Sequence, residues 1–513
     1  MPVIEWGMSP ADSVEMERKY DVDGPSSLPP LNKLPGVVRA EVPVEHGLEA
    51  VYFDTADQIL AARGITLRRR TGGDDAGWHL KLPAGPDERR ELREPPGNDP
   101  NNIPAQLLQY VRVFVRDLPL IPVARLKTRR VVHRLRGAGD EVLADVADDH
   151  VQAERLGPEP LSLNWREWEI ELVEGSPALL DAAQSVLAAA GVRPARHASK
   201  LARALGDPPQ KGSPEPPPRP ARKGPASAVL LAYVHDQVRA LTEQDPQVRQ
   251  DAPGSVHQMR VATRRLRSIL ATYRKLLDAG AANRLRGELK WLAGCLGEAR
   301  DAEVMRERLN EMVAHEPPEL VLGPVSRRIE EELGADYHAA HVKVLQALDD
   351  QRYFRLLDAL DAFLAAPPLK VPEPGPAHTI VAALIRKDWK RLRRDVRTAT
   401  STAEGADHDP ALHQVRKSAK RLRYASESFE PVQPKRAARL TLAAHGLQKI
   451  LGEHQDSVVT RDVLRRLGVQ TPLAGENGFT YGRLHALEQS IAADSEARFL
   501  EAWKGFPAAP PKK

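Results

Sequence analysis

A proline-rich segment divides the chain into two parts that have to fold around separate cores. In residues 207–225, DPPQKGSPEPPPRPARKGP, eight of nineteen positions are proline, and none is aromatic or a large aliphatic residue. Proline removes backbone hydrogen-bond donors and favours extended conformations, so such a segment spaces two domains instead of joining one core. We therefore predict an N-terminal domain over residues 1–206, a semi-rigid linker over 207–225 and a C-terminal domain over 226–508.

The composition is that of a globular protein rich in helix. Of the 513 residues, 42% are hydrophobic, 28% are charged and only 5% are aromatic. The single cysteine, Cys295, excludes an internal disulfide framework and a zinc site built on thiolates, and we expect it to fill space in the core. No secretory leader pattern opens the chain, and no window approaches the ~20 apolar residues of a membrane helix. We therefore expect a cytoplasmic protein without a membrane segment.

The N-terminal domain reads as α+β. Short runs such as EAVYFDT, WHLKLP and WREWEIELVE are broken by Gly, Pro, Asp and Asn, which predicts an antiparallel sheet or barrel interrupted by two helical patches. In EMERK, alternation on a strand puts Glu15, Glu17 and Lys19 on one face. Paired carboxylates suit Mg²⁺ or Mn²⁺, and a neighbouring lysine suits phosphate oxygens. For this motif alone, a solvated strand edge is the simpler interpretation.

Other strands repeat this alternation with basic residues. Arg68 and Arg70 share one face, Lys81 lies between apolar neighbours, and Arg125, Lys127 and Arg129 follow one another at every second position. The carboxylates Glu167, Glu169 and Glu171 alternate with Trp168 and Ile170. A barrel with an apolar outside and a charged lumen would hold a metal and a polyphosphate, whereas a sandwich with a solvated charged face is the structural alternative.

The motifs EMERK, YFDT, LRRR, WHLKLP, RLKTRR, EIELVEG and ASKLARALG, in this order over residues 14–206, resemble the CYTH superfamily of triphosphate tunnel metalloenzymes. The resemblance implies an eight-stranded antiparallel β tunnel that binds triphosphates with Mg²⁺ or Mn²⁺ and has its catalytic signature at Glu15, Glu17 and Lys19. It implies a metal set of Glu15, Glu17, Glu169, Glu171 and Asp148. It implies substrate-binding cations at Lys19, Arg68, Arg70, Lys81, Arg125, Lys127, Arg129 and Lys200.

Two positions of this assignment are ambiguous. In LADVADDHV, Asp148 fits the acidic position by alignment, but Asp145 and Asp149 would face the other side of the same strand. In ERRELRE, Glu91 is the better candidate. The reaction implied is metal-assisted phosphoryl transfer to water, with the phosphates held by side chains because no GxxxxGK[ST] loop is evident.

The C-terminal domain reads as a helical bundle with an internal repeat. Apolar residues recur at three- and four-residue spacing, and HQMRVATRRLRSIL from His257 matches HQVRKSAKRLRYAS from His413. LGEARD from Leu296 matches LGEHQD from Leu451, so two motifs recur at offsets of 156 and 155 residues. This regularity predicts an all-α domain made of two four-helix repeats.

Each repeat carries a basic stripe along one helix. At about 100° per residue, His257, Arg260, Arg264 and Arg267 fall within about 80° of one another. The matching residues of the second repeat are His413, Arg416, Lys420 and Arg423. A single stripe would most simply be a solvated face, but two matching stripes could enclose a polyanion. Few aromatic residues interleave these cations, which disfavours nucleic acid as the partner.

The repeated motifs over residues 226–508 resemble the CHAD domain, a histidine-bearing helical module. The resemblance implies a basic surface that binds inorganic polyphosphate, with His257 and His413 at corresponding places. We expect Glu298, Asp301, Glu453 and Asp456 to pair with the basic helices.

The leading hypothesis is a metal-dependent triphosphatase, acting on inorganic triphosphate, tethered to a polyphosphate-binding domain and associated with polyphosphate granules. The alternatives are adenylyl cyclase, thiamine-triphosphate hydrolysis, or a granule adaptor without turnover.

Overall fold

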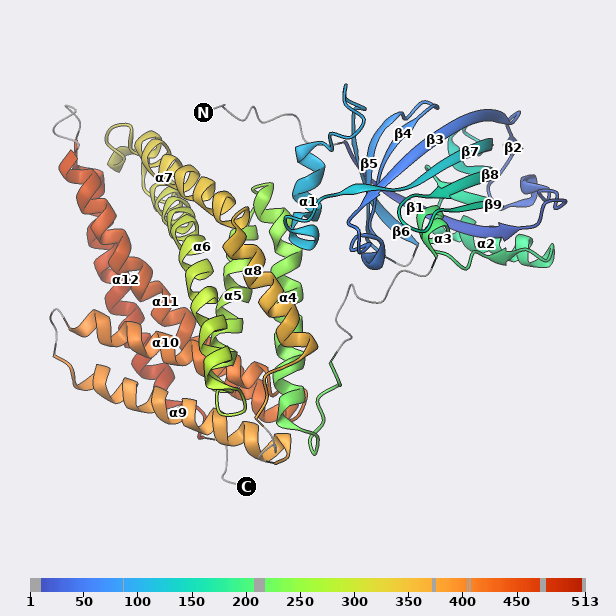
Figure 1. The fold of residues 1–513 in the computed structure, drawn as a ribbon. Coiled ribbons are helices and arrows are strands. Elements are labelled where there is room, and N and C mark those ends of the chain that lie inside the picture. Colours follow the sequence, from blue (N-terminus) through green and yellow to red (C-terminus); the bar gives the residue numbers. More distant parts are fainter. Residues whose placement is uncertain are drawn as a thin grey trace. The chain divides into compact units, whose positions relative to one another are not determined.

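The protein forms two compact units. A computed structural model describes residues 11–85, 87–206, 217–370, 375–403, 405, 407–470 and 477–509. The two units are Met1–Pro214 and Glu215–Lys513 (Figure 1). The division falls inside the predicted linker 207–225, of which residues 207–216 lie outside the described residues.

The first unit is built on a closed antiparallel barrel of eight strands. The pairing order is β1–β6–β5–β4–β3–β7–β8–β9, and β9 pairs with β1 to close the ring. β1 closes it by pairing with β6 through residues 11–16 and with β9 through residues 17–22. Two short strands, β2 (Arg39–Ala40) and β10 (Arg193–Pro194), pair with β7 and β1. The predicted α+β tunnel is therefore confirmed.

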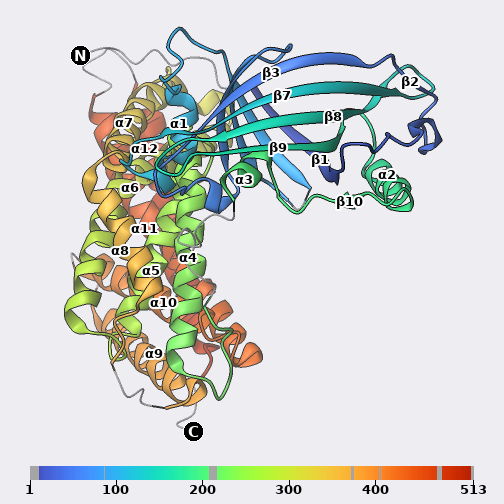
Figure 2. The same cartoon turned by 45° about the vertical axis from the view of Figure 1, so that its right-hand side comes forward.

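The barrel strands differ in length. β3, β7, β8 and β9 run side by side in Figure 2, and the longest is β7. The bounds of the eight strands are β1 Ala11–Val22, β3 Val44–Asp54, β4 Thr66–Thr71, β5 Gly77–Pro83, β6 Glu88–Glu94, β7 Ile121–Arg136, β8 Val142–Arg155 and β9 Leu161–Leu172. Turns of 3₁₀ helix occur at η1 Leu31–Lys33 and η2 Ala61–Arg63.

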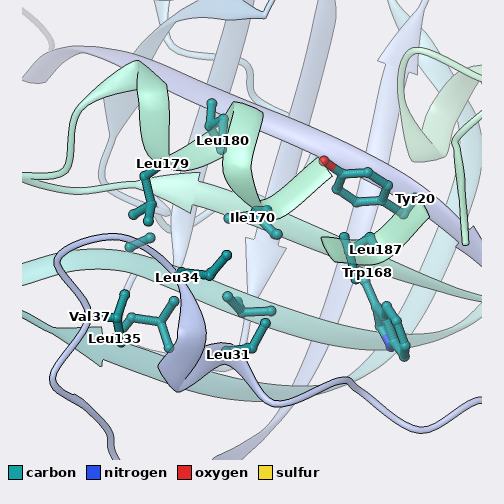
Figure 3. Packing of buried hydrophobic residues seen from close by; sticks show 13 residues of the cluster. Tyr20, Leu31, Leu34, Val37, Leu135, Trp168, Ile170, Leu179, Leu180 and Leu187 are labelled. Carbon is teal, nitrogen blue, oxygen red and sulfur yellow. The ribbon is translucent and has the colours of Figure 1, made fainter. Parts of the chain in front are cut away.

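Two helices cover parts of the outer wall. α2 (Pro177–Ala189) packs Leu179 and Leu187 with Trp168 and Ile170 of β9, as Figure 3 shows. α1 (Ala105–Val115) packs in a second cluster with outward residues of β3 to β6. Burial of these apolar side chains stabilises the wall at roughly 25 cal/mol per Å² of apolar area. The glutamates of β1 and β9 are left on the opposite face, inside the barrel.

A third helix packs on the inside of the wall. α3 (Lys200–Leu205) buries Leu201 and Leu205 against Tyr52 and Leu126, which face the lumen. Ser199 caps its N-terminus by accepting a hydrogen bond from the backbone N–H of Ala202 at 3.0 Å. One end of the lumen is thus filled by apolar side chains, and the opposite end remains charged.

The second unit is entirely helical over its described residues. Its helices are α4 Ala226–Arg249, α5 Ser255–Thr272, α6 Ala279–Ala314, α7 Val325–Leu348, α8 Gln351–Ala365, α9 Ala377–Ser401, α10 His408–Glu427, α11 Pro434–Gln470 and α12 Phe479–Lys504, with a 3₁₀ turn η4 at Pro318–Leu320. None of the helices in the described residues is long and apolar enough to cross a membrane.

The helical repeat predicted from the sequence corresponds to α4–α7 and α9–α12. α5 and α10 carry the two histidine motifs, and α6 and α11 carry the two LGE motifs. α8 is an addition to the first repeat that the prediction of four helices per repeat omitted. It is held by Tyr353, which donates to Asp245 at 2.8 Å, and by Arg352, which pairs with Glu288 at 2.6 Å.

Candidate functional site

The barrel encloses a charged lumen with a volume of about 390 Å³. Alternation along β1 points Glu15, Glu17 and Lys19 inward, whereas Met16 packs on the outer core. The sequence-predicted residues that line this lumen are Glu15, Glu17, Lys19, Arg68, Arg70, Lys81, Glu91, Glu169, Glu171 and Lys200. They come from β1, β4, β5, β6, β9 and α3, so closure of the barrel brings together residues that are up to 185 positions apart.

The prediction that Arg125, Lys127 and Arg129 line the lumen is wrong. All three are exposed on the outer face of β7, where Arg129 pairs with Glu45 at 3.0 Å. The inward residues of β7 are instead Leu126, Thr128, Arg130, Val132 and Arg134. The reason is that α3 fills the lumen beside Leu126, while neither α1 nor α2 packs over the middle of β7 on the outside.

Asp148 also points away from the lumen, which corrects its assignment to the metal set. Its carboxylate accepts two hydrogen bonds from Arg166 at 2.8 and 2.6 Å on the outer face. Asp145, three residues before it, and Asp149, the next residue, have the opposite parity on the strand and face inward. Of the three alternatives, Asp149 is fully buried and lies nearest the predicted carboxylates of β9.

The site residues assigned from the sequence omitted several charged residues of the described lumen, among them Arg89, Arg93, Arg130 and Arg134, and gave no ligand role to Glu167. Arg130 is the most central, because its guanidinium donates to Asp149 at 2.8 and 2.6 Å and to Glu169 at 2.5 Å. The alternation of β9 predicts Glu167 on the same face as Glu169, and the two lie together in the structure. For Arg130 the alternation of β7 suggested the wrong face.

The pKa values of the two β1 carboxylates, Glu15 and Glu17, are shifted in opposite directions. Burial raises the pKa of Glu15 to about 7, against the opposing effect of Lys81, which forms an ion pair with it. Burial also disfavours the charged form of Glu17, but Lys19, at 2.9 Å, and Lys81 together outweigh burial and lower the pKa of Glu17. Glu171 has no ion-pair partner in the described part of the chain, and burial raises its pKa despite Lys81. Glu15, Glu17 and Glu171 thus form an incompletely neutralised acidic wall.

A second acidic group surrounds the ammonium of Lys200. Asp149, Glu167 and Glu169 can bring one oxygen each within 4.8 Å of one another. Lys200 Nζ lies 2.8, 2.8 and 2.6 Å from these carboxylates. Its charge is therefore held in place by three buried anions, which raise the pKa of Lys200 against the effect of burial.

These carboxylates fit a hard divalent cation. Mg²⁺ and Mn²⁺ prefer oxygen ligands, and Mg²⁺ is typically held by one or two carboxylates together with phosphate oxygens and water. The unpaired Glu171, beside Glu17 on the neighbouring strand, supplies such ligands. The trio around Lys200 supplies another set, but in the present structure the lysine ammonium already neutralises it.

The cationic part of the lumen fits phosphate oxygens. Arg68 and Arg70 are largely buried, and the Nε–H of each has no acceptor among the described residues. Burial, followed by the nearby Arg68 and Arg130, lowers the pKa of Arg70 to about 9, so the crowded cations repel one another. Buried donors without acceptors are costly, and an anion would satisfy them.

In the helical unit, the histidine motifs bring four cations together. Arg260 and Arg264 of α5 and Arg416 and Lys420 of α10 are close enough to repel one another, and the Nε–H groups of the three arginines are buried without acceptors in the described residues. Burial, followed by Arg416, Arg264 and Arg260, lowers the pKa of Lys420 to about 6. The cluster is therefore short of negative charge.

The LGE motifs explain how these arginines are placed. A Cβ on Gly297 would lie 3.5 Å from Arg260, and a Cβ on Gly452 would lie 3.3 Å from Arg416. The repeated glycine thus lets each guanidinium lie close against the helix that follows. The nearby histidines are half-buried, and burial lowers the pKa of both His257 and His413.

Two other predicted residues of the basic stripes, Arg423 and Arg267, have neighbours outside the four-cation cluster. Arg423 pairs with Glu427 at 2.7 Å, and Arg267 is among the neighbours of Arg286. Asp301 pairs with Arg260 at 3.2 Å, as expected, and Asp456 interacts with Arg416.

The prediction that Glu298 and Glu453 pair with the basic helices is wrong. They reach Lys343 of α7 and Arg498 of α12, at 3.0 and 2.9 Å.

Comparison with known proteins identifies both units. The CYTH domain family matches residues 13–204, and the CHAD domain family matches residues 232–465. The chain is 41% identical over 504 residues to the uncharacterized protein Rv2226 of Mycobacterium tuberculosis (strain ATCC 25618 / H37Rv), with 94% of each chain covered.

Two solved structures are also similar to parts of the chain. The CHAD domain of the plant Ricinus communis has 26% identity and a TM-score of 0.46, over 58% of this chain and 99% of that one. HpAC1 from Hippeastrum, described as revealing a dominant triphosphatase activity, has 17% identity and a TM-score of 0.23, over 39% of this chain and 99% of that one. On the two domain matches and the full-length relative, the chain belongs to the proteins in which a CYTH domain is followed by a CHAD domain.

Proposed function

We propose that the barrel hydrolyses a triphosphate, with inorganic triphosphate as the preferred substrate, in the presence of Mg²⁺ or Mn²⁺. The observation that carries this proposal is the pairing of two environments in one lumen. Arg68 and Arg70 offer buried donors without acceptors, and Glu17 and Glu171 offer carboxylates for a cation. A metal triphosphate presents the complementary charges to both.

The residues of the lumen would have different roles in the reaction. Arg68, Arg70, Lys81 and Arg130 would bind the phosphate oxygens and stabilise the charge that develops on the transferred phosphoryl group. A cation held by Glu15, Glu17, Glu169 and Glu171 would polarise the terminal phosphoryl group. Lys19, which pairs with Glu17 and Glu169, would hold these carboxylates in orientation. A water oriented by the β1 carboxylates would then attack in line.

The test is a substrate panel with the purified full-length protein. Inorganic triphosphate, ATP and thiamine triphosphate are each offered with Mg²⁺ or Mn²⁺, while phosphate, pyrophosphate and cyclic AMP are measured. We expect metal-dependent release of phosphate, fastest from inorganic triphosphate. Cyclic AMP as the main product would instead favour a cyclase, and no metal-dependent turnover of any substrate would contradict an enzymatic role and favour a granule adaptor.

The helical unit is proposed to bind inorganic polyphosphate. Support comes from the four clustered cations of α5 and α10, whose nearby carboxylates are Asp301 and Asp456. A flexible polyanion without bases would neutralise this cluster without needing the aromatic stacking that single-stranded nucleic acids use. These two activities would suit a protein that lies on polyphosphate granules in a reducing cytoplasm.

Lys420 leads to a prediction about pH. In the free protein its pKa of about 6 leaves the amine neutral at higher pH, whereas a bound polyanion favours the ammonium. Binding should therefore take up a proton, and affinity for polyphosphate should rise as the pH is lowered from about 9 towards about 6. Calorimetric titration in two buffers of different ionisation enthalpy measures this uptake.

The matched control is Lys420→Arg, which stays charged over this range. It should bind polyphosphate with less proton uptake and a flatter pH profile than the wild type. Burial lowers the pKa of both histidines in the free protein, and both are present in the wild type and in Lys420→Arg, so the difference between the two proteins reports on Lys420. An unchanged pH profile in Lys420→Arg would show that Lys420 does not change protonation on binding.

A further inference from the structure

The turn between β4 and β5 leans over the open end of the lumen. Residues 72–76 lie at the end of the barrel opposite α3, where the half-exposed Arg134 brings the lumen to the surface. Gly72 has a φ of +79°, and a Cβ on it would lie 2.2 Å from the backbone oxygen of Gly47 in β3. Since only glycine allows this close approach, the turn is held against β3 at the rim.

The same turn carries two carboxylates into the lumen lining. Asp75 forms an ion pair with Arg70, one of the two arginines with an unsatisfied Nε–H. Its backbone oxygen also contacts His79 Nε2 at 2.9 Å, which ties the turn to β5. A carboxylate therefore occupies the position at Arg70 that a phosphate oxygen would take, and an entering phosphate has to displace it.

Asp74 is the preceding residue of the same turn and lies at the same opening. It is exposed and lines the lumen, and with the larger effects of Asp145 and Glu41 it raises the pKa of Arg134 on β7 against the effect of burial. Arg134 is itself paired with Asp145 at 3.0 Å, so its charge is already neutralised. Within the described residues, the deep lumen thus holds two Nε–H donors without acceptors, on Arg68 and Arg70, whereas its rim is bordered by carboxylates.

We propose that Asp74 and Asp75 are specificity-determining residues that limit the length of the polyanion the barrel hydrolyses. This inference rests on the proposed triphosphatase function. The phosphates of a short chain all lie among the cations of the lumen, whereas a longer chain must pass its additional phosphates between Asp74 and the Asp145–Arg134 pair. Every chain has to displace Asp75 from Arg70, whereas the repulsion between like charges at the rim acts only on the phosphates of a longer chain that extend beyond the lumen.

The test compares inorganic triphosphate with linear tetraphosphate and longer linear chains as substrates of the full-length protein. In the variant Asp74→Asn/Asp75→Asn we expect kcat/KM for the longer chains, relative to that for triphosphate, to rise by about tenfold. Raising the salt concentration should increase this ratio in the wild type and change it less in the variant, because the repulsion is screened. A purely structural role of the turn would not produce this difference in salt dependence.

The matched control is Asp57→Asn/Asp99→Asn, which removes two exposed carboxylates that do not line the lumen. It should keep the wild-type ratio. Triphosphate turnover verifies that each variant is folded. If the wild type hydrolyses triphosphate but the ratio in Asp74→Asn/Asp75→Asn is unchanged, the inference about chain length is wrong and the proposed function stands. If the wild type hydrolyses no chain, both are wrong.

Discussion

Replacing Glu15 and Glu17 together by glutamine is expected to reduce metal-dependent triphosphate hydrolysis by about 10³-fold. Both side chains face the lumen, where they border the incompletely neutralised Glu171. Glutamine keeps the size of each side chain but removes the negative charge that a divalent cation requires. The measurement is kcat/KM for inorganic triphosphate over a range of Mn²⁺ concentrations, together with polyphosphate binding, which should not change.

The control for this variant is Glu49→Gln/Glu154→Gln. Glu49 is half-exposed and Glu154 is exposed on the outer faces of β3 and β8, so their loss removes two carboxylates from the same barrel without altering the lumen. We expect near wild-type turnover. Equal activity in the two variants, or full activity of Glu15→Gln/Glu17→Gln, would contradict the assignment of β1 as the catalytic strand.

Reversing the charges of Arg264 and Arg416 is expected to weaken polyphosphate binding by about 100-fold or more. One arginine comes from each repeat, and each has a buried Nε–H without an acceptor in the described chain. Arg264→Glu/Arg416→Glu would place two carboxylates beside Asp301 and Asp456, which adds repulsion to the loss of attraction. Affinity is measured at several salt concentrations, and the salt dependence should also decrease.

Arg436→Glu/Arg439→Glu is the matched control, because it makes the same change in net charge at exposed positions near the start of α11. It should retain most of the affinity. Triphosphate turnover by the barrel should be the same in both variants. If the two variants lost affinity equally, overall charge and not the α5–α10 cluster would account for polyphosphate binding.

Much of this architecture could be predicted because its signals are local or repeated. In β1 and β9 the inward carboxylates alternate with Met16, Trp168 and Ile170, which pack on the outer core, so each strand has one charged and one apolar face. In the helical unit, two motifs at nearly equal offsets required a duplicated structure. The same repeat also predicted that Arg260 and Arg416 would occupy corresponding places, and Gly297 and Gly452 give the structural reason.

β7 and β8 could not be oriented in this way, because both faces of these strands are polar. The outer face of β7 carries Arg125, Lys127 and Arg129, and its inner face carries Arg130 and Arg134. Alternation identifies the two faces of such a strand but does not say which one lies inside. The same ambiguity separates Asp148 from its neighbours Asp145 and Asp149.

The sequence by itself determined the two domains, the charged faces of β1 and β9 and the duplication of the basic helices. Each of these depends on residue spacing within one segment or on a repeated motif. Only the tertiary structure decided that Arg130 and Asp149 enter the lumen, that Lys200 lies among three carboxylates, and that the 72–76 turn covers the rim. These features depend on α3 entering the barrel and on which parts of the wall are covered by helices, and such long-range packing leaves no periodic pattern in the chain.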